Sequence, residues 1–146
     1  MAKAVLTHSP SSRYDDHPES RYHFPSQYLN QVQAALHDWV VFYEPRRTAG
    51  SGSSSGRSAY YAVAMLTAID EDPDRPDHFY ARISGYLEFD TPVPFKAGAH
   101  YFERALQKSD GSTNRGAFGR SVRVLEADEF DSIVHVGLSR SEEHTS

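Results

Sequence analysis

Apolar residues along this chain occur in short runs separated by polar, glycine-rich and proline-rich segments, a pattern typical of strands joined by loops. The run at 39–43 is followed by the glycine- and serine-rich segment 48–58 and then by a second apolar run. This order predicts a hairpin of two strands that holds a soft loop. Strands are expected over residues 4–7, 39–43, 59–69, 79–89 and 119–125.

Two segments show the spacing of an amphipathic helix. Over residues 27–37, Leu29, Val32 and Leu36 recur at helical intervals, and Ser26 is placed to cap the first turn. A second helix is expected over residues 127–136. Its apolar stripe is Phe130, Ile133 and Val134, and Gly137 is placed to end it.

The remaining segments complete a single mixed domain. Residues 91–95 hold two prolines and are expected to be extended but not a central strand, and Gly85 predicts a bulge or a close approach. Residues 101–107 fit either a short helix or a strand, and 109–116 a turn-rich loop. The predicted fold class is α+β over residues 1–138, a curved mixed sheet or small β-barrel closed by two helices.

Composition narrows the class of protein without naming a function. The 146 residues are 38% apolar and 12% aromatic, as in one globular domain, and no apolar run approaches the ~20 residues of a membrane span. The absence of cysteine excludes disulfides and thiol nucleophiles and fits a reducing cytoplasm. The net charge of −5 is unevenly placed, with an excess of carboxylates in residues 70–90 and of cations in residues 103–123. These segments are either two solvated faces or an acidic and a basic side that orient the domain on a phosphate backbone.

No complete catalytic or metal-binding constellation is present in the sequence. Residues 52–56 match Gly-x-Ser-x-Gly, but they lead into a strand rather than a helix, and their spacing does not fit a phosphate loop. Asp70, Asp72 and Asp74 begin like a calcium loop whose required glycine and final glutamate are missing. The histidines lack metal-site spacing, and no lysine follows a carboxylate by two residues, which excludes one class of nuclease. We therefore expect no catalytic residues, metal or cofactor in this chain.

Cations and aromatic residues occur where nucleic-acid binding uses them. Arginines on the flanks of the first hairpin and in the glycine-rich segment 109–123 can meet phosphates, and an aromatic pocket can test an extruded base, including a modified one. Tyr60 and Tyr61 must point to opposite faces of a strand, and about half of such rings must be core. The expected phosphate contacts are Arg46, Arg47, Arg57, Lys108, Arg115, Arg120 and Arg123, and the expected base pocket is Tyr43, Tyr61 and Phe118.

Several blocks of the chain together resemble the amino-terminal domain of bacterial HNH endonucleases of the restriction type. The blocks are RYHFP at 21–25 with Tyr28-Leu29, DWVVFYEPRR at 38–47, DHFYA at 77–81, LQK at 106–108, DGSTN at 110–114 and GAFGR at 116–120. The resemblance implies a DNA-recognition module with a PUA-, EVE- or SRA-like fold, ahead of a metal-dependent nuclease domain that this chain lacks. The divalent metal would belong to that missing domain, so the fragment is predicted inactive.

The sequence therefore predicts a cytoplasmic DNA-binding domain, and two alternatives stay open. One is an RNA-binding or structural PUA-like module unrelated to restriction, and the other is a small complete enzyme. Residues 140–146 resemble the translation of a sequencing adapter, so we expect 139–146 to be a non-native tail.

Overall fold

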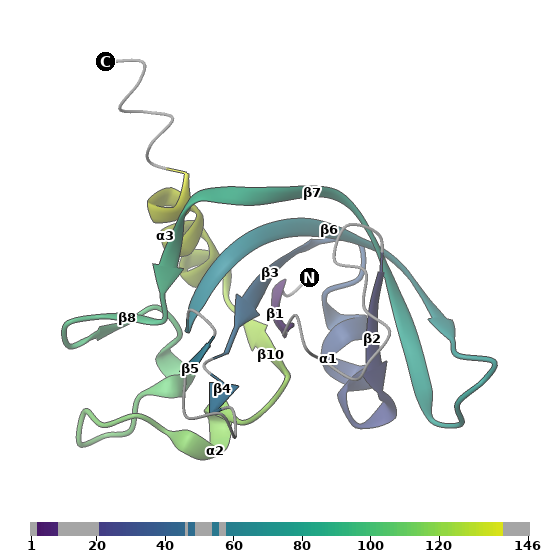
Figure 1. The fold of residues 1–146 in the computed structure, drawn as a ribbon, viewed down its shortest axis with the longest axis horizontal. Coiled ribbons are helices and arrows are strands. Elements are labelled where there is room, and N and C mark those ends of the chain that lie inside the picture. The colour runs from purple at the N-terminus through teal and green to yellow at the C-terminus, as the bar shows by residue number, and fades with distance from the viewer. Residues whose placement is uncertain (1–2, 9–20, 46, 49–53, 56–57, 139–146) are drawn as a thin grey trace.

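The centre of the molecule is a curled six-stranded sheet that forms a half-barrel (Figure 1). The computed structural model describes residues 3–8, 21–45, 47–48, 54–55 and 58–138. The strand order is β10-β1-β3-β6-β7-β2, and β1 and β3 are parallel whereas the other neighbours are antiparallel. The strands of the sheet are β1 (Lys3–Thr7), β2 (Arg21–Pro25), β3 (Trp39–Glu44), β6 (Ala59–Glu71), β7 (His78–Pro94) and β10 (Val122–Leu125).

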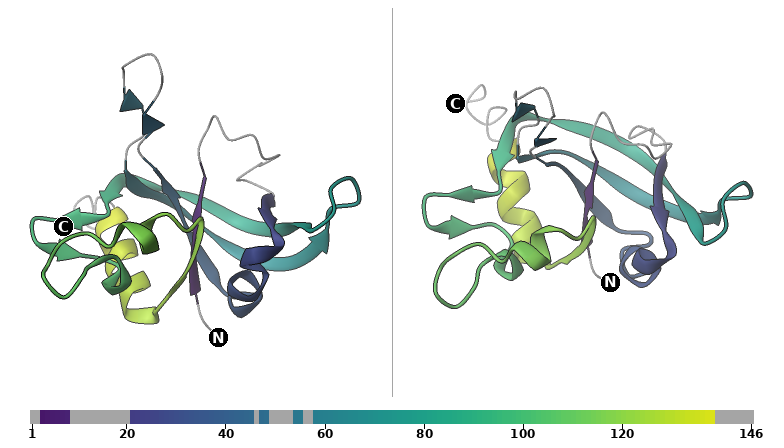
Figure 2. Two further views of the ribbon diagram at one scale, coloured as in Figure 1. Left: turned by 90° about the horizontal axis from the view of Figure 1, so that it is seen from below. Right: turned by 60° about the horizontal axis from the view of Figure 1, so that its bottom comes forward.

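Helices lie near the two ends of the curled sheet, with α1 at one end and α3 at the other (Figure 2). The helices and helical turns are η1 (Ser26–Tyr28), α1 (Leu29–Ala34), η2 (Arg104–Leu106), α2 (Arg115–Phe118) and α3 (Ala127–Gly137). Two small hairpins, β4 (Arg47–Thr48) with β5 (Ser54–Ser55) and β8 (Lys96–Ala97) with β9 (His100–Tyr101), extend from the sheet. The predicted α+β class is confirmed. Within the described residues, no helix has the length and apolar character needed to cross a bilayer.

The curl comes from irregularities between the two longest strands. The pairing of β6 with β7 shifts register at three places, and each extra residue bends a strand and increases its twist. One shift lies between the pairs Met65–Ser84 and Val63–Leu87, which enclose Gly85. Gly85 has φ +65°, a conformation that favours glycine, and the Trp39 ring lies over it. The predicted bulge at this glycine is confirmed.

Strand alternation divides the interior into two clusters, one on each face of the sheet. Val40 and Phe42 of β3 join the cluster beneath α1, whereas Val41 and Tyr43 join the cluster beneath α3. The same alternation separates neighbouring residues of β6. Tyr60 therefore packs on the α3 side and Tyr61 on the α1 side, as predicted.

The structure corrects the first half of the predicted element order. Strand β2 was not predicted, and it forms the edge of the sheet beside the start of β7. The first helix is shorter than expected and ends at Ala34, because His37 adopts φ +69° and donates its backbone N–H to Leu66 O at 2.7 Å. Ser26 does not cap this helix, since Pro25 precedes the helical turn and no side-chain cap is formed.

The second half differs mainly at chain reversals. Residues 91–94 continue β7, and Val93 and Pro94 pair with β6 where no further strand covers them, which is the edge position that prolines tolerate. The ambiguous segment 101–107 divides into β9 and η2, and a turn of helix, α2, begins inside the predicted loop. Gly137 lies within α3 rather than after it. A Cβ there would lie 2.5 Å from the Phe89 ring, so this glycine permits close packing and does not end the helix.

Candidate nucleic-acid interface

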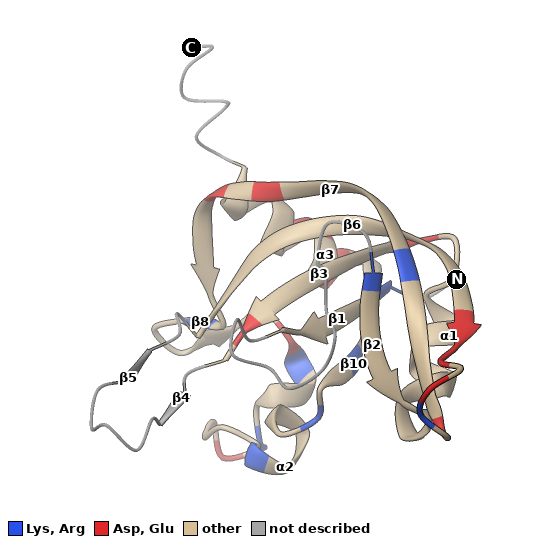
Figure 3. Ribbon diagram, turned by 45° about the vertical axis from the view of Figure 1, so that its right-hand side comes forward, with Lys and Arg blue, Asp and Glu red and all other residues tan. Residues whose placement is uncertain are grey.

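Charges are separated on the surface of this fold (Figure 3). Carboxylates mark the turn between β6 and β7 and the part of β7 that carries Glu88 and Asp90, whereas Lys and Arg gather around α2 on another side of the molecule. Segment 103–123, which was predicted to be basic, supplies most of these cations. Their surroundings decide which of them a ligand can reach.

Arg104 is occupied by carboxylates at the start of α3. Its guanidinium donates to Asp128 Oδ2 at 2.8 Å and to Glu126, and its backbone N–H donates to Glu129 Oε2 at 2.7 Å. The hydrogen bonds of Asp128, then the charge of Glu129, raise the pKa of Arg104 above its ordinary value. Arg104 therefore joins η2 to α3 and is not a free cation for a ligand.

Arg123 is buried, with 6% of the residue exposed, and forms a two-bond ion pair with Glu103. Its Nε donates to Glu103 Oε2 and its Nη2 to Glu103 Oε1, both at 2.8 Å. Burial opposes the charged form, but the hydrogen bonds and charge of Glu103 outweigh it, so the pKa of Arg123 is raised. This predicted phosphate contact faces the interior, and we remove it from the set of surface cations.

The buried pair extends into a network that holds the end of α2. Glu103 Oε1 also accepts a hydrogen bond from Tyr60 Oη at 2.6 Å, and burial followed by the Glu103 charge raises the Tyr60 pKa. On its other side, Arg123 Nη1 donates to Arg120 O at 3.0 Å and to Phe118 O at 3.4 Å. The network therefore connects the backbone of residues 118–120 directly to the core.

The three aromatic residues predicted as a base pocket do not lie together. Tyr43 is 1% exposed and packs against Tyr60 and Phe118 at ring-centroid distances of 5.3 and 5.6 Å, with Arg123 lying 5.5 Å from the Tyr43 and Phe118 centroids. Burial raises the Tyr43 pKa to about 12. Tyr61 belongs to the cluster on the opposite face. Tyr43 is a core residue, because the pairing of β3 with β6 turns it inward, and Phe118 of α2 is partly buried against the same cluster.

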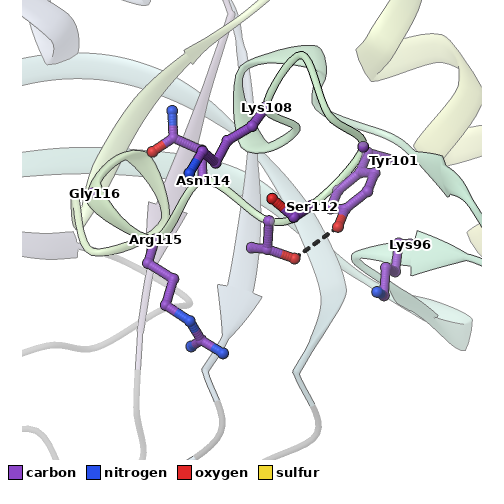
Figure 4. Close-up of a pocket in the computed structure, with 9 residues that line it drawn as sticks. Lys96, Tyr101, Lys108, Ser112, Asn114, Arg115 and Gly116 are labelled. Atoms are coloured by element: carbon purple, nitrogen blue, oxygen red, sulfur yellow. Dashed lines mark hydrogen bonds between the residues drawn. The ribbon is translucent and has the colours of Figure 1, made fainter.

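Four cations remain exposed around α2, and we call them the basic face: Lys96, Lys108, Arg115 and Arg120. No ion pair involves any of them within the described part of the chain. Three of them, Lys96, Lys108 and Arg115, line one open cavity of about 700 Å³ (Figure 4). The fourth lines a smaller cavity of about 270 Å³ together with Ala117, so that α2 lies between the two.

Local hydrogen bonds shape the loop that carries Lys108 and Arg115. Lys108 O accepts from Gly111 N at 2.9 Å and Lys108 N donates to Ser112 O at 2.8 Å, which closes a tight turn with Gly111 at φ +90°. Asn114 Oδ1 then accepts from Ala117 N at 3.2 Å and caps α2. The turn and the cap together fix the position at which Arg115 leaves the loop.

The arginines predicted from the first hairpin are placed only in part. Arg47 belongs to β4, which pairs with β5, and nothing further is described for it. Arg46 and Arg57 lie outside the described residues, as does the predicted tail. Sequence reasoning missed Lys96, which has no other cation near it in the chain. It reaches the cavity because the β8–β9 hairpin folds back beside the loop of Lys108.

No group of three or more potential metal ligands is found among the described residues. The arrangement around α2 offers positive charge, exposed glycines and two cavities, but no nucleophile paired with a base. Its chemistry is that of anion binding.

The half-barrel of one curled mixed sheet with a few helices is consistent with a PUA-like domain. The chain is similar in fold to Rpa0253 from Rhodopseudomonas palustris, with a TM-score of 0.58 and 16% identity over 94% of this chain and 93% of that one. It is also similar to the N-terminal domain of Staphylothermus marinus McrB, with a TM-score of 0.55 and 12% identity over 90% of this chain and 92% of that one. At these identities the likeness concerns the fold. No protein-family model and no curated protein sequence matches the chain.

Proposed function

We propose that this chain is a DNA-binding domain that holds the sugar–phosphate backbone against the basic face. The observation that carries the proposal is the contrast among its cations. Arg104 and Arg123 are occupied by carboxylates, whereas Lys96, Lys108, Arg115 and Arg120 are exposed together around α2. Exposed Lys and Arg side chains on one surface are the features with which proteins bind phosphates. The PUA-like fold agrees with the sequence resemblance to DNA-recognition domains of restriction endonucleases.

The negative net charge does not oppose this role, because much of it comes from carboxylates that lie away from α2. The acidic turn between β6 and β7 and the acidic residues of β7 lie away from α2 (Figure 3). Their repulsion orients a polyanion toward the basic face. This arrangement of charge favours approach of a polyanion from the side of α2.

Salt-dependent binding tests the proposal. With a 3′-labelled 20-base-pair duplex, fluorescence anisotropy from 50 to 200 mM salt should give a log–log slope of about −3 to −4 if each of the four cations contacts one phosphate. The double substitution Lys108→Glu and Arg115→Glu should abolish binding. Arg75→Ala, in the acidic turn, is the control that also removes positive charge and should bind as the wild type does. A wild-type slope near zero would disprove the proposal, and equal binding to duplex RNA would favour the RNA-binding alternative.

Reading of an extruded base is a finer proposal, and it now concerns only the face that carries Tyr61. There Phe42 lies between Tyr61 and Tyr86, at ring-centroid distances of 6.1 and 5.8 Å. Phe42 and Tyr61 are buried and Tyr86 is partly exposed, so base reading here requires the rings of this face to open toward the ligand. If this face reads a modification, a duplex with one modified base will bind more tightly than the unmodified duplex, and Tyr61→Ala will remove the difference. Equal affinities for every modification tried would reject base reading.

The finer assignment to an HNH restriction endonuclease rests on the resemblance of the sequence blocks. It predicts that the genomic reading frame continues past Leu138 into a domain with His-Asn-His metal chemistry. It also predicts that the purified chain, supplied with magnesium, leaves plasmid DNA uncut. A stop codon at that point in the genome would overturn the assignment, while DNA binding by the basic face would be unaffected.

A further inference from the structure

The cavity beside α2 is built from two separate parts of the chain. One wall is the β8–β9 hairpin, which carries Lys96, and the other is the loop from Lys108 to the first turn of α2, which carries Arg115 (Figure 4). The volume of about 700 Å³ lies within the range of small-ligand pockets and is large enough for a nucleotide unit. The size of the cavity therefore suits one unit of a nucleic-acid backbone.

A hydrogen bond joins the two walls. The hydroxyls of Tyr101, at the end of β9, and Thr113, in the loop, share a bond with 2.6 Å between their oxygens (Figure 4). Because Tyr101 is 5% exposed, water competes little for this bond. The spacing between the walls, and with it the spacing of the cations, is thereby set in the free protein.

Lys96 is held over aromatic rings at one side of the cavity. Its Nζ lies 5.4 Å from the ring centroid of Tyr101 and 5.9 Å from that of Phe95. A cation at this distance from a ring is attracted by the negative charge of the ring face. The contact with the rings therefore holds the ammonium group beside the cavity. Because the Lys96 side chain is already ordered, it loses less entropy when it binds a ligand than a lysine without such a contact would.

The lining of the cavity contains three cations and no carboxylate. The acidic residue nearest in sequence is Asp110, whose carboxylate accepts hydrogen bonds from Ser112 N at 2.9 Å and Ser112 Oγ at 2.6 Å. These bonds hold the Asp110 side chain against its own turn. A ligand in the cavity therefore meets an excess of positive charge.

We propose that this cavity is a phosphate subsite that receives one nucleotide unit of DNA, with its phosphate group between Lys96, Lys108 and Arg115. The inference rests on the proposed DNA binding and adds to it a fixed point on the nucleic acid. Lys96 is a phosphate contact, and Tyr101 is a positioning residue that sets the distance of Lys96 from the other two cations. The phosphate is either a 5′-terminal monoester or an internal diester, and the two share the same chemistry of recognition.

The salt slope distinguishes a lost phosphate contact from a general loss of stability. Lys96→Ala should reduce the magnitude of the slope by about 0.9, the value for one phosphate, whereas Arg75→Ala should not change it. Lys96 is exposed, so its truncation should lower the thermal unfolding midpoint only slightly, through the lost contact with the Tyr101 and Phe95 rings. Tyr101→Phe keeps the ring under Lys96 but removes the bond to Thr113, and it should weaken binding without changing the slope.

Two forms of one duplex identify the source of the phosphate. If a 5′-phosphorylated duplex binds more tightly than its 5′-hydroxyl form, and Lys96→Ala removes the difference, the subsite takes a strand end. If both forms bind equally and Lys96→Ala weakens both, it takes an internal phosphate. A wild-type slope retained in Lys96→Ala would overturn this inference while leaving DNA binding intact. Absence of any salt-dependent binding by the wild type would instead reject the proposed function itself.

Discussion

Glu103 shows how one residue can support a surface from beneath it. Its two carboxylate oxygens accept three hydrogen bonds, two from Arg123 and one from Tyr60, and only 2% of the residue is exposed. Through Arg123 the bonds continue to the backbone at Phe118 and Arg120. The backbone at the end of α2, next to the exposed Arg120, thus depends on a buried charge.

Glu103→Gln should therefore destabilise the protein strongly. The amide keeps the shape of the side chain but leaves the Arg123 charge buried without compensation, which typically costs about 3–5 kcal/mol. Urea unfolding measures the change. Tyr60→Phe, which removes only one neutral donor from the same carboxylate, is the matched control and should cost about 1–3 kcal/mol. Equal losses in the two variants would show that the Arg123 charge is not the dominant partner.

Gly137 makes a second prediction at the scale of one residue. Gly→Ala inside a helix normally stabilises by roughly 0.5–1 kcal/mol. Here the new methyl carbon would lie 2.5 Å from the Phe89 ring, so Gly137→Ala should instead destabilise by about 1–3 kcal/mol. Combining it with Phe89→Leu should recover part of the loss, and thermal unfolding of the three variants tests this. A stabilised Gly137→Ala protein would contradict the close packing of α3 on β7.

Helix α2 is a single turn that contains a glycine, a residue that weakens a helix. Gly116 lies in its first turn, yet its backbone does not require glycine, and a Cβ would be 3.6 Å from Asn114 Oδ1, an ordinary contact. Gly116 lines the cavity between Lys108 and Arg115 and is exposed. The fold does not require a glycine here, and the proposed phosphate ligand gives a reason for the missing side chain.

Gly116→Ala should consequently change stability and binding in opposite directions. The helix gains up to about 1 kcal/mol because alanine restricts the unfolded chain, while the added methyl group obstructs the approach of a phosphate backbone. The expected result is a higher unfolding midpoint together with weaker binding to duplex DNA. Gly98→Ala is the control, because it lies in the neighbouring hairpin outside the cavity; its φ of +61° predicts a lower midpoint instead. Unchanged affinity in Gly116→Ala would remove this glycine from the interface.

Strand β2, which pairs with β7, is also joined to the turn after β6 by a buried polar pair. His23 Nε2 lies 2.9 Å from Asp72 Oδ2, and Asp72 Oδ1 accepts a hydrogen bond from Asp74 N in the turn after β6. The Tyr80 ring stacks on His23 at a centroid distance of 4.6 Å. The backbone bond from Asp74, followed by the bond and charge of His23, holds the Asp72 pKa below its ordinary value.

This pair predicts a specific sensitivity to acid. A carboxyl whose pKa is lower in the folded than in the unfolded protein stabilises the fold. This stabilisation is complete at a pH above the unfolded-state pKa, and it is lost as the pH falls through the folded-state pKa. The unfolding midpoint should therefore decrease below about pH 4, the ordinary range of an aspartate. In Asp72→Asn, the midpoint should start lower at pH 6 and decrease less between pH 4 and 2.5. Parallel curves for the two proteins would contradict the role of Asp72.

At the scale of the whole molecule, the predictable part of the fold was the part encoded by neighbouring residues. The apolar runs of β3 and β6 and the bulge at Gly85 follow from local pattern, and all were confirmed. Strand β2 was missed because it buries a polar residue, His23. That burial is explained only by the contact of His23 with Asp72, which lies 49 positions away in the sequence. Long-range polar pairs of this kind leave no periodic signal in a sequence.

The candidate site was predictable to a similar extent. A basic segment ending at Arg123 was visible, but nothing local distinguishes the buried Arg123 from the exposed Arg115, because the difference lies in Glu103. Lys96 belongs to the site because the β8–β9 hairpin folds back beside it. Tyr43 does not belong to it, because the pairing of β3 with β6 turns its side chain into the core. The residue types in the sequence therefore predicted the chemistry of the surface better than they predicted which residues belong to it.

The position of β1 has a consequence for how the molecule is made. This strand comes first in the chain, yet in the sheet it lies between β3 and β10, and its partners in β10 are about 120 positions later. During synthesis, Lys3–Thr7 can pair with β3 early, but its other edge stays open until almost the whole domain has left the ribosome. An open edge of this kind can pair with another chain. Fragments that end before Val122 should therefore associate through β1, and chaperones that cover strand edges should act on this protein late in its synthesis.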